Sequence, residues 1–137
     1  MQRLLDFHAR HKYLLMAHSP DGCQRLGRLL SGLRDADLHA LAREYLSGLM
    51  AGLMQNSGTT RHVNVLQHIL GYLKRSISAS DKAELLAVLE AYRQREIPLA
   101  VPVMSLRRHV HCCPDEYIGR QWYLCPYPDE LELRDYL

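Results

Sequence analysis

The sequence contains no uninterrupted apolar run of the roughly 18 residues that a membrane-spanning helix needs. Its first ten residues include Arg3, Asp6, His8 and Arg10, where a secretory signal would place an apolar core. A hydrophobic share of 47% with 23% charged residues also excludes a disordered or fibrous chain. We therefore expect a cytoplasmic protein with no membrane partner, folded as one domain over residues 1–137.

Cysteine is scarce, and the cysteines follow no framework spacing. They are Cys23, Cys112, Cys113 and Cys125. Because two of them are adjacent, an ordinary disulfide pattern is awkward and we expect reduced thiols. A zinc site is the alternative, because zinc prefers Cys and His ligands; the candidates are His109, His111, Cys112, Cys113 and Cys125. The chain lacks paired Cys-x-x-Cys motifs, so we predict no metal.

No stretch alternates polar and apolar residues as a strand does, whereas apolar residues recur at helical spacing. We therefore predict an all-α fold, a single compact bundle of about six or seven helices. Four expected helices span 3–17, 20–33, 82–95 and 115–123. A further helix is capped by Asp35 and ends at 54, and the basic helix after it is capped by Thr59 or Thr60. The other start signals are Ser19, which caps the helix from 20, and the segment 78–81, which precedes the helix from 82.

Proline controls the chain from residue 97 onward. Pro98 and Pro102 lie four apart, so either a helix reaching 109 is kinked, or its first turn is irregular and it begins after Pro102. Cys125-Pro126-Tyr127-Pro128 cannot continue a helix and predicts an extended, Pro- and Tyr-containing C-terminal tail.

Acidic residues are missing from two long stretches. No Asp or Glu lies between Tyr45 and Ser80, or between Ile97 and Pro114, so the formal net charge of +2 hides a segregated pattern. Wound as a helix, residues 61–77 separate into two faces. The apolar face consists of Leu66, Ile69, Leu70, Leu73 and Ile77. The other consists of Arg61, Asn64, Gln67, His68, Gly71, Lys74 and Arg75. This second face is either an ordinary solvated surface or, since it carries cations and no carboxylate, a surface for an anion.

Histidine is concentrated near the N-terminus, where His8, His11 and His18 share one side of the first expected helix with apolar residues. Such histidines either hydrogen-bond to buried groups and fix the packing, or line a ligand pocket. His62 projects toward the apolar side of its own helix, so we predict that it is buried and structural.

Four motifs together resemble a known family. They are FHARHKYLLMAHS (7–19), RHVNVLQHILGY (61–72), IPL (97–99) and YLCPYP (123–128). In this order they are similar to the YbgA-like family, a bacterial domain of unknown function. The resemblance covers nearly the whole chain, although the family pattern has Asn where this chain has Cys125.

The resemblance implies a role in RNA metabolism. Members occur alone or fused behind a desulfidase-like domain, whose iron–sulfur cluster removes sulfur from thiolated uracil and which is associated with thiouridine in transfer RNA. This chain has no plausible three-cysteine cluster site, so we expect no cofactor here. Any desulfidation would then belong to a partner domain or protein.

We accordingly predict an RNA-binding accessory domain, with transfer RNA as the expected partner. Cations would contact phosphates, polar side chains would read base edges and Gly71 would allow close approach. The expected RNA-binding residues are Lys12, Arg61, Asn64, Gln67, His68, Gly71, Tyr72, Lys74, Arg75, Arg107 and Arg108. Tyr117, Trp122 and Tyr123 are further candidates for base stacking.

Two other functions remain open. One is a small enzyme in which His11 or His68 acts as general acid–base and Arg61 holds an anionic substrate. The other is a module that only docks a catalytic partner protein. Docking predicts weak RNA binding with little salt dependence, whereas phosphate contacts predict a steep one.

Overall fold

The computed structural model describes residues 1–32, 37–110 and 116–124. Seven α-helices and one short 3-10 helix occur in these ranges, with no strand, which confirms the all-α prediction. They are α1 (Gln2–His18), α2 (Pro20–Ser31), α3 (Leu38–Leu53), α4 (Thr59–Leu73), α5 (Ala79–Arg93), α6 (Ala100–Val110), α7 (Glu116–Gly119) and the 3-10 helix η1 (Trp122–Leu124). The predicted extended tail from Cys125 lies outside the described residues.

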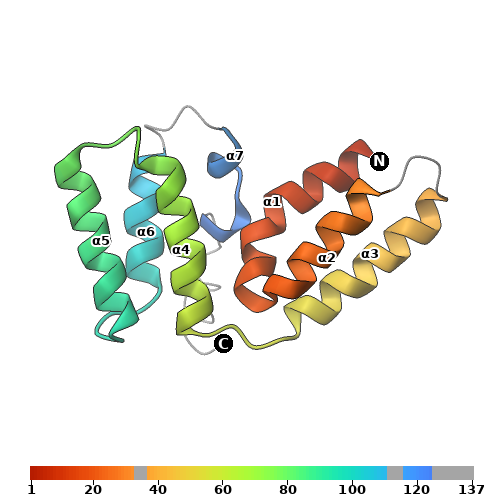
Figure 1. The fold of residues 1–137 in the computed structure, drawn as a ribbon, viewed down its shortest axis with the longest axis horizontal. Helices are drawn as coiled ribbons and strands as arrows, with labels where there is room; N and C mark the ends of the chain where they lie inside the picture. Colours follow the sequence, from red (N-terminus) through yellow and green to blue (C-terminus); the bar gives the residue numbers. More distant parts are fainter. Residues whose placement is uncertain (33–36, 111–115, 125–137) are drawn as a thin grey trace.

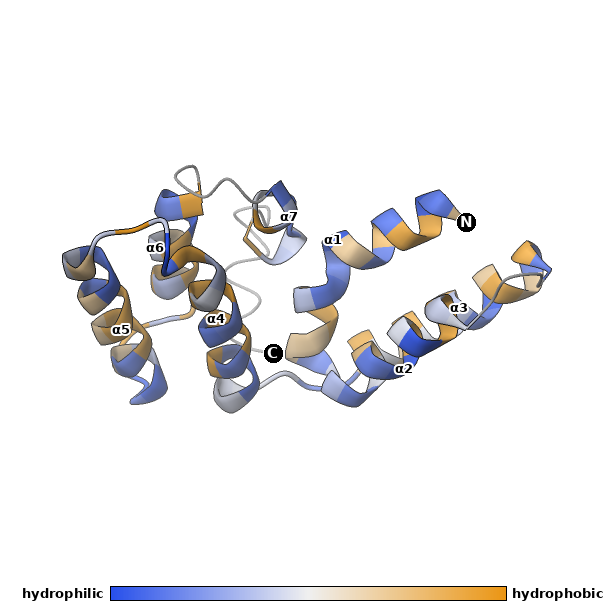
Figure 2. Ribbon diagram, turned by 45° about the horizontal axis from the view of Figure 1, so that its top comes forward, coloured by the Kyte–Doolittle hydropathy of each residue, from blue (hydrophilic) through white to orange (hydrophobic). Residues whose placement is uncertain are grey.

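The helices form two groups placed side by side. Figure 1 shows α1, α2 and α3 at one end of the molecule and α4, α5 and α6 at the other, with α7 above the junction. The larger core lies among α4, α5 and α6, and the smaller core among α1, α2 and α3. Helix α1 joins them, because its Tyr13 and Ala17 belong to the larger core and its Leu15 to the smaller. Figure 2 shows both hydrophilic (blue) and hydrophobic (orange) residues along α4 and α5, as expected for helices with one polar and one apolar side.

Two predicted start signals are confirmed. The Ser19 hydroxyl accepts a hydrogen bond from the Gly22 amide at 3.0 Å, and Pro20 occupies the first helical position of α2, where its missing amide costs nothing. Within the predicted signal 78–81, the Ser78 hydroxyl likewise accepts from the Asp81 amide at 3.1 Å, so α5 begins at Ala79 and not at 82.

Two other predicted caps are wrong. Helix α3 is capped by Asp37, whose carboxylate accepts from the His39 amide at 2.9 Å, and not by Asp35. Thr59 and Thr60 are already helical, because the first turn of α4 is closed by the His62 amide on the Gly58 carbonyl at 3.0 Å. Gly58 therefore caps α4 with no side-chain hydrogen bond.

The C-terminal helices also differ from the prediction. Helix α6 begins at Ala100, before Pro102. Proline is tolerated at this position because the amides of the first turn have no hydrogen-bond partner within the helix. The expected helix 115–123 is divided into α7 and η1. Between them the Gln121 side-chain amide donates to the Ala9 carbonyl at 2.7 Å, which draws this segment onto α1. The apolar pattern of 82–95 predicts that Leu86 faces inward together with Leu85 and Leu89, but Leu86 is exposed because only the other two lie on the buried side of α5.

No described helix has the length and apolarity required to cross a lipid bilayer.

Candidate nucleic-acid interface

Helix α4 has the two faces that its sequence predicts. Leu66, Ile69 and Leu73 are fully buried in the larger core, and Ile77 packs against it. The opposite face, here called the polar face of α4, is exposed to solvent. It consists of Asn64, Gln67, His68 and Gly71, and is continued by Lys74 and Arg75. Lys74 and Arg75 are exposed, and neither side chain forms an ion pair with another residue that the structure describes.

Gly71 lies near the middle of this face and is exposed. A Cβ atom built on it would have no neighbour within 4 Å. No contact among the described residues therefore requires glycine here, although glycine destabilises a helix interior by roughly 0.5–1 kcal/mol relative to alanine.

Arg61 is separated from the rest of the predicted set. Its guanidinium donates to the main-chain carbonyl of His18 and, at 3.1 Å, to that of Asn56. The side chain is half-buried, and its position is set by the end of α1 and the loop before α4. This gives Arg61 a structural role in the described fold.

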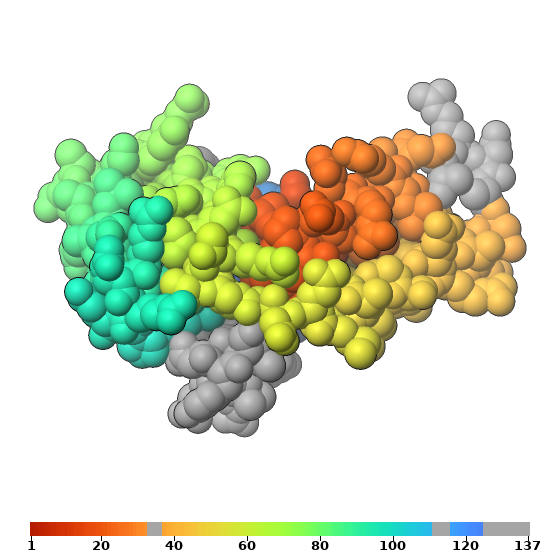
Figure 3. Space-filling model, turned by 60° about the horizontal axis from the view of Figure 1, so that its bottom comes forward, coloured from red at the N-terminus to blue at the C-terminus, as the bar shows by residue number. Residues whose placement is uncertain are grey.

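A groove of about 560 Å³ lies along one flank of the polar face, between α1, α2 and α4. Figure 3 shows α4 in yellow-green beside the red and orange surfaces of α1 and α2. The groove brings together three predicted residues, Lys12, Asn64 and His68. It adds the cation Arg28, which the sequence did not indicate, because α2 reaches the groove by packing on α1, which in turn packs on α4. We call it the α1–α2–α4 groove.

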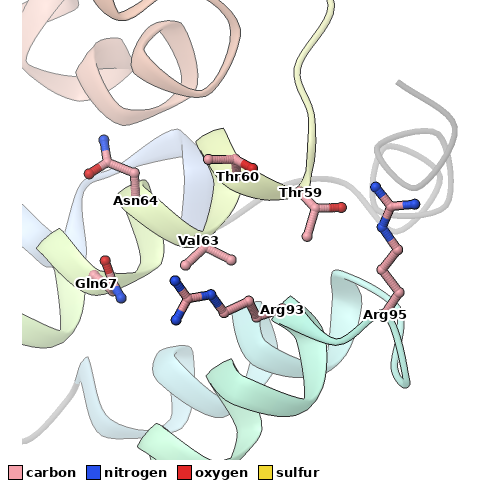
Figure 4. Close-up of a pocket in the computed structure, with 7 residues that line it drawn as sticks. All are labelled: Thr59, Thr60, Val63, Asn64, Gln67, Arg93 and Arg95. Carbon is pink, nitrogen blue, oxygen red and sulfur yellow. The ribbon is translucent and has the colours of Figure 1, made fainter.

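A second hollow of about 350 Å³ lies on the other flank, between α4 and the C-terminal end of α5. Figure 4 shows Arg93 reaching under α4 toward Gln67, while Arg95 extends on the side of Thr59. Arg93 also forms an exposed ion pair with Glu90 at 3.7 Å. Arg95 lies two residues after the end of α5 and has a φ of 62°, a left-handed conformation that is uncommon for residues other than glycine. Neither arginine was predicted, again because their position depends on packing.

The remaining predicted cations lie at the C-terminal ends of α4 and α6. Helices α4 and α6 run in the same direction, so Lys74 and Arg75 emerge at the same end as Arg107 and Arg108 in the last turn of α6. Cations at helix C-termini are favoured by the helix dipole alone. Apart from Arg61, the predicted cations are thus divided between the groove and the C-terminal ends of α4 and α6.

The aromatic candidates differ in accessibility. Tyr123 is fully buried, so its ring cannot stack on an external base, and that prediction is wrong for the described fold. Tyr72 is 43% exposed and Trp122 is 37% exposed, which leaves both rings partly open. Tyr117 is half-buried and contacts the Tyr72 ring with centroids 5.8 Å apart.

The histidines mostly fix packing. His11 and His18 bond through Nδ1 to the main-chain carbonyls of Phe7 and Gln55, at 2.7 and 2.8 Å. His62 is buried, as predicted, and its Nδ1 lies 2.9 Å from the Tyr123 hydroxyl. His68 lines the groove, while His11 stacks between Phe7 and Trp122 and does not line it.

His8 lies where the groove meets the smaller core. Its Nδ1 is 3.0 Å from the hydroxyl of the fully buried Tyr45. Burial, then the charge of Lys12, then that of His11 lower the His8 pKa from its ordinary value. Burial raises the pKa of Tyr45 to about 12 and raises that of the Cys23 thiol, so both stay neutral at physiological pH.

The described residues contain no group of three side chains able to hold a metal ion. His111, Cys112, Cys113 and Cys125, named above as possible zinc ligands, lie outside the described ranges.

Comparison of the sequence with known proteins identifies the family of this chain. A family model described as "Protein of unknown function (DUF1722)" matches residues 12–128. The chain is 29% identical over 132 residues to the "Uncharacterized protein YbgA" of Escherichia coli (strain K12), covering 96% of this chain and 78% of that protein. No solved structure matches. With most of its length matched by the family model, the chain belongs to the YbgA-like DUF1722 family.

Proposed function

We propose that this protein is an RNA-binding accessory domain that holds transfer RNA for an enzyme removing sulfur from thiolated uridine. One observation carries the proposal: the polar face of α4 has no carboxylate and lies between two hollows that are lined by cations. Such a role would take place in the cytoplasm.

The charge distribution suits a phosphate backbone. Lys12 and Arg28 lie on one flank of α4, and Arg93 and Arg95 on the other. A polyanion lying along α4 could contact both flanks, which gives sequence-independent affinity through counterion release. Asn64, at the border of both hollows, could read a base edge, as amides commonly do.

The link to sulfur chemistry comes from the family resemblance. The proposed partner is a desulfidase-like domain or protein with an iron–sulfur cluster, since the sequence has only four cysteines and two of them are adjacent. In this proposal the partner performs the reaction, and this domain supplies affinity and orientation for the RNA.

The test is binding of the purified protein to bulk transfer RNA and to a duplex DNA of equal charge, over a salt series. We expect tighter binding to transfer RNA, and about five phosphate contacts would give a slope of roughly −4 to −5 for the logarithm of the association constant against that of salt concentration. Absence of binding at low salt would refute the proposal and favour protein docking. In that case the first surface to mutate would be the exposed apolar residues Leu46 and Met50 of α3 and Met54, which caps its C-terminus.

A further inference from the structure

The α1–α2–α4 groove has a feature that phosphate binding alone does not need, which is a small, partly apolar floor. Met16 and Cys23 line it, and the Cys23 thiol is held by a hydrogen bond to the Lys12 carbonyl at 3.6 Å. Gly27 also lines the groove, and a Cβ atom built there would meet only the His8 Nε2 atom, at 3.7 Å. Glycine therefore keeps this part of the groove open.

The rim of the groove is mainly cationic. Lys12 and Arg28 carry positive charge, His68 adds a titratable ring, and the only carboxylate among the lining residues is Asp21. Two side-chain amides, Gln24 and Asn64, stand among them. An anionic ligand with hydrogen-bonding edges and a nonpolar face matches this lining.

His8 supplies a polar group of defined character. Its Nδ1 faces the Tyr45 hydroxyl at 3.0 Å, and Tyr45 is fully buried. A buried hydroxyl proton needs an acceptor, and Nδ1 is the acceptor within reach. If Tyr45 donates to Nδ1, the neutral imidazole carries its proton on Nε2, so that a hydrogen-bond donor is presented beside Gly27 in the groove.

We propose that the groove binds a single nucleotide unit, with its phosphate beside Lys12 and Arg28 and its base over the floor formed by Met16, Cys23 and Gly27. The volume of about 560 Å³ lies within the range of roughly 300–1,000 Å³ that is usual for small-ligand sites. The unit is either an unpaired nucleotide of an RNA or a free nucleoside monophosphate. In the RNA form the inference rests on the proposed function and deepens it.

Titration of the full chain followed by NMR tests the groove directly. The probes are uridine monophosphate and the other three nucleoside monophosphates, with inorganic phosphate and uridine as partial ligands. We expect at least one monophosphate to shift the amide signals of Gly27 and Asn64, at concentrations at least tenfold below those that inorganic phosphate needs. Equal responses to the monophosphates and to phosphate would overturn the proposal, because the base would not be recognised.

A matched pair of variants tests the position. Gly27→Met fills the groove, whereas Ala87→Met adds a similar side chain on the exposed side of α5. We expect Gly27→Met to weaken nucleotide binding at least tenfold and Ala87→Met to bind as the parent does. If circular dichroism shows that Gly27→Met loses helicity, Arg28→Gln replaces it. This exposed substitution removes a positive charge from the groove, so it should also weaken nucleotide binding.

The same variants separate the two sources of the nucleotide. If Gly27→Met also weakens transfer RNA binding tenfold, the nucleotide belongs to the RNA. If only mononucleotide binding is lost, the ligand is a free nucleotide. Nucleotide binding without any RNA binding would refute the proposed function and leave the groove site standing. RNA binding that no groove variant alters, together with no mononucleotide binding, would refute the groove site alone.

Discussion

The guanidinium of Arg61 donates a hydrogen bond to the main-chain carbonyl of His18, the last residue of α1. The last four carbonyls of a helix have no partner within it, so the side chain satisfies one of them. A second bond to the Asn56 carbonyl holds the loop that enters α4. Arg61, which the sequence analysis places among the expected RNA-binding residues, thus joins α1, this loop and α4.

Arg61→Ala is therefore expected to destabilise the fold. Loss of a charged, half-buried donor should lower the free energy of unfolding by about 1–3 kcal/mol. Urea denaturation followed by circular dichroism measures this. Lys74→Ala is the control, and as an exposed change it should stay within about 0.5 kcal/mol of the parent. Equal stability of the two variants would contradict the structural role of Arg61.

The contact between His62 and Tyr123 gives a second stability prediction. Both side chains are buried, and His62 Nδ1 lies 2.9 Å from the Tyr123 hydroxyl, which connects α4 to η1. Tyr123→Phe retains the ring and removes the hydroxyl, so it should cost about 1–2 kcal/mol of unfolding free energy. Thermal and urea unfolding check this, and an unchanged midpoint would mean that the bond adds no net stability.

The sequence predicted the faces of α4 because burial against one core imposes the helical period on its residues. It predicted His62 as structural for the same reason, since that histidine points toward the apolar side. The two start signals at Ser19 and Ser78 were readable because a cap acts on an amide three residues away. These features depend on local geometry alone.

Features that depend on packing between distant segments could not be predicted from the sequence. Arg28 reaches the α1–α2–α4 groove because α2 packs on α1, which in turn packs on α4. Arg93 and Arg95 reach the second hollow because α5 packs on α4. Arg61 shows the converse case, because its acceptor on His18 is 43 residues away and no local pattern marks it. The cap at Asp37 was missed because two aspartates precede α3 and the sequence does not decide between them.

The lowered pKa of His8 makes a prediction about pH. Burial is the first cause and the nearby Lys12 the second, so the folded protein resists protonating this ring. The other charged or titratable groups around the groove are Asp21, Cys23, Arg28 and His68, with Tyr45 on α3. The unfolded chain takes up the proton near the ordinary value of 6.5, so below it the unfolded state binds more protons and stability falls.

We expect the unfolding free energy to be highest above pH 6.5 and to decrease as the pH falls through the folded pKa of His8. His8→Gln cannot titrate and should show a shallower decrease between pH 7.5 and 5. Urea unfolding of both proteins across this range makes the comparison. Parallel curves would mean that other groups cause the pH dependence.

Gly71→Ala should separate stability from binding. The alanine Cβ atom has no neighbour within 4 Å at this exposed site, so the free energy of unfolding should rise by roughly 0.5–1 kcal/mol. If the RNA approaches the α4 backbone closely at this position, the same methyl group should weaken transfer RNA binding. Thermal unfolding and a binding titration on one preparation test both effects. A stabilised variant with unaltered affinity would exclude close approach at Gly71.

Charge removal at the end of α4 should change the salt dependence of binding more than the fold. Lys74→Ala with Arg75→Ala removes two exposed cations from the proposed interface, so each lost phosphate contact should reduce the salt slope by about 0.9. Arg25→Ala with Arg43→Ala removes the same charge from α2 and α3, outside both hollows beside α4, and is the matched control. Equal slopes for the two double variants would show that net charge, and not this surface, drives the binding. A reduced slope for the first pair alone, at unchanged helicity, would locate the phosphate contacts on the continuation of the polar face of α4.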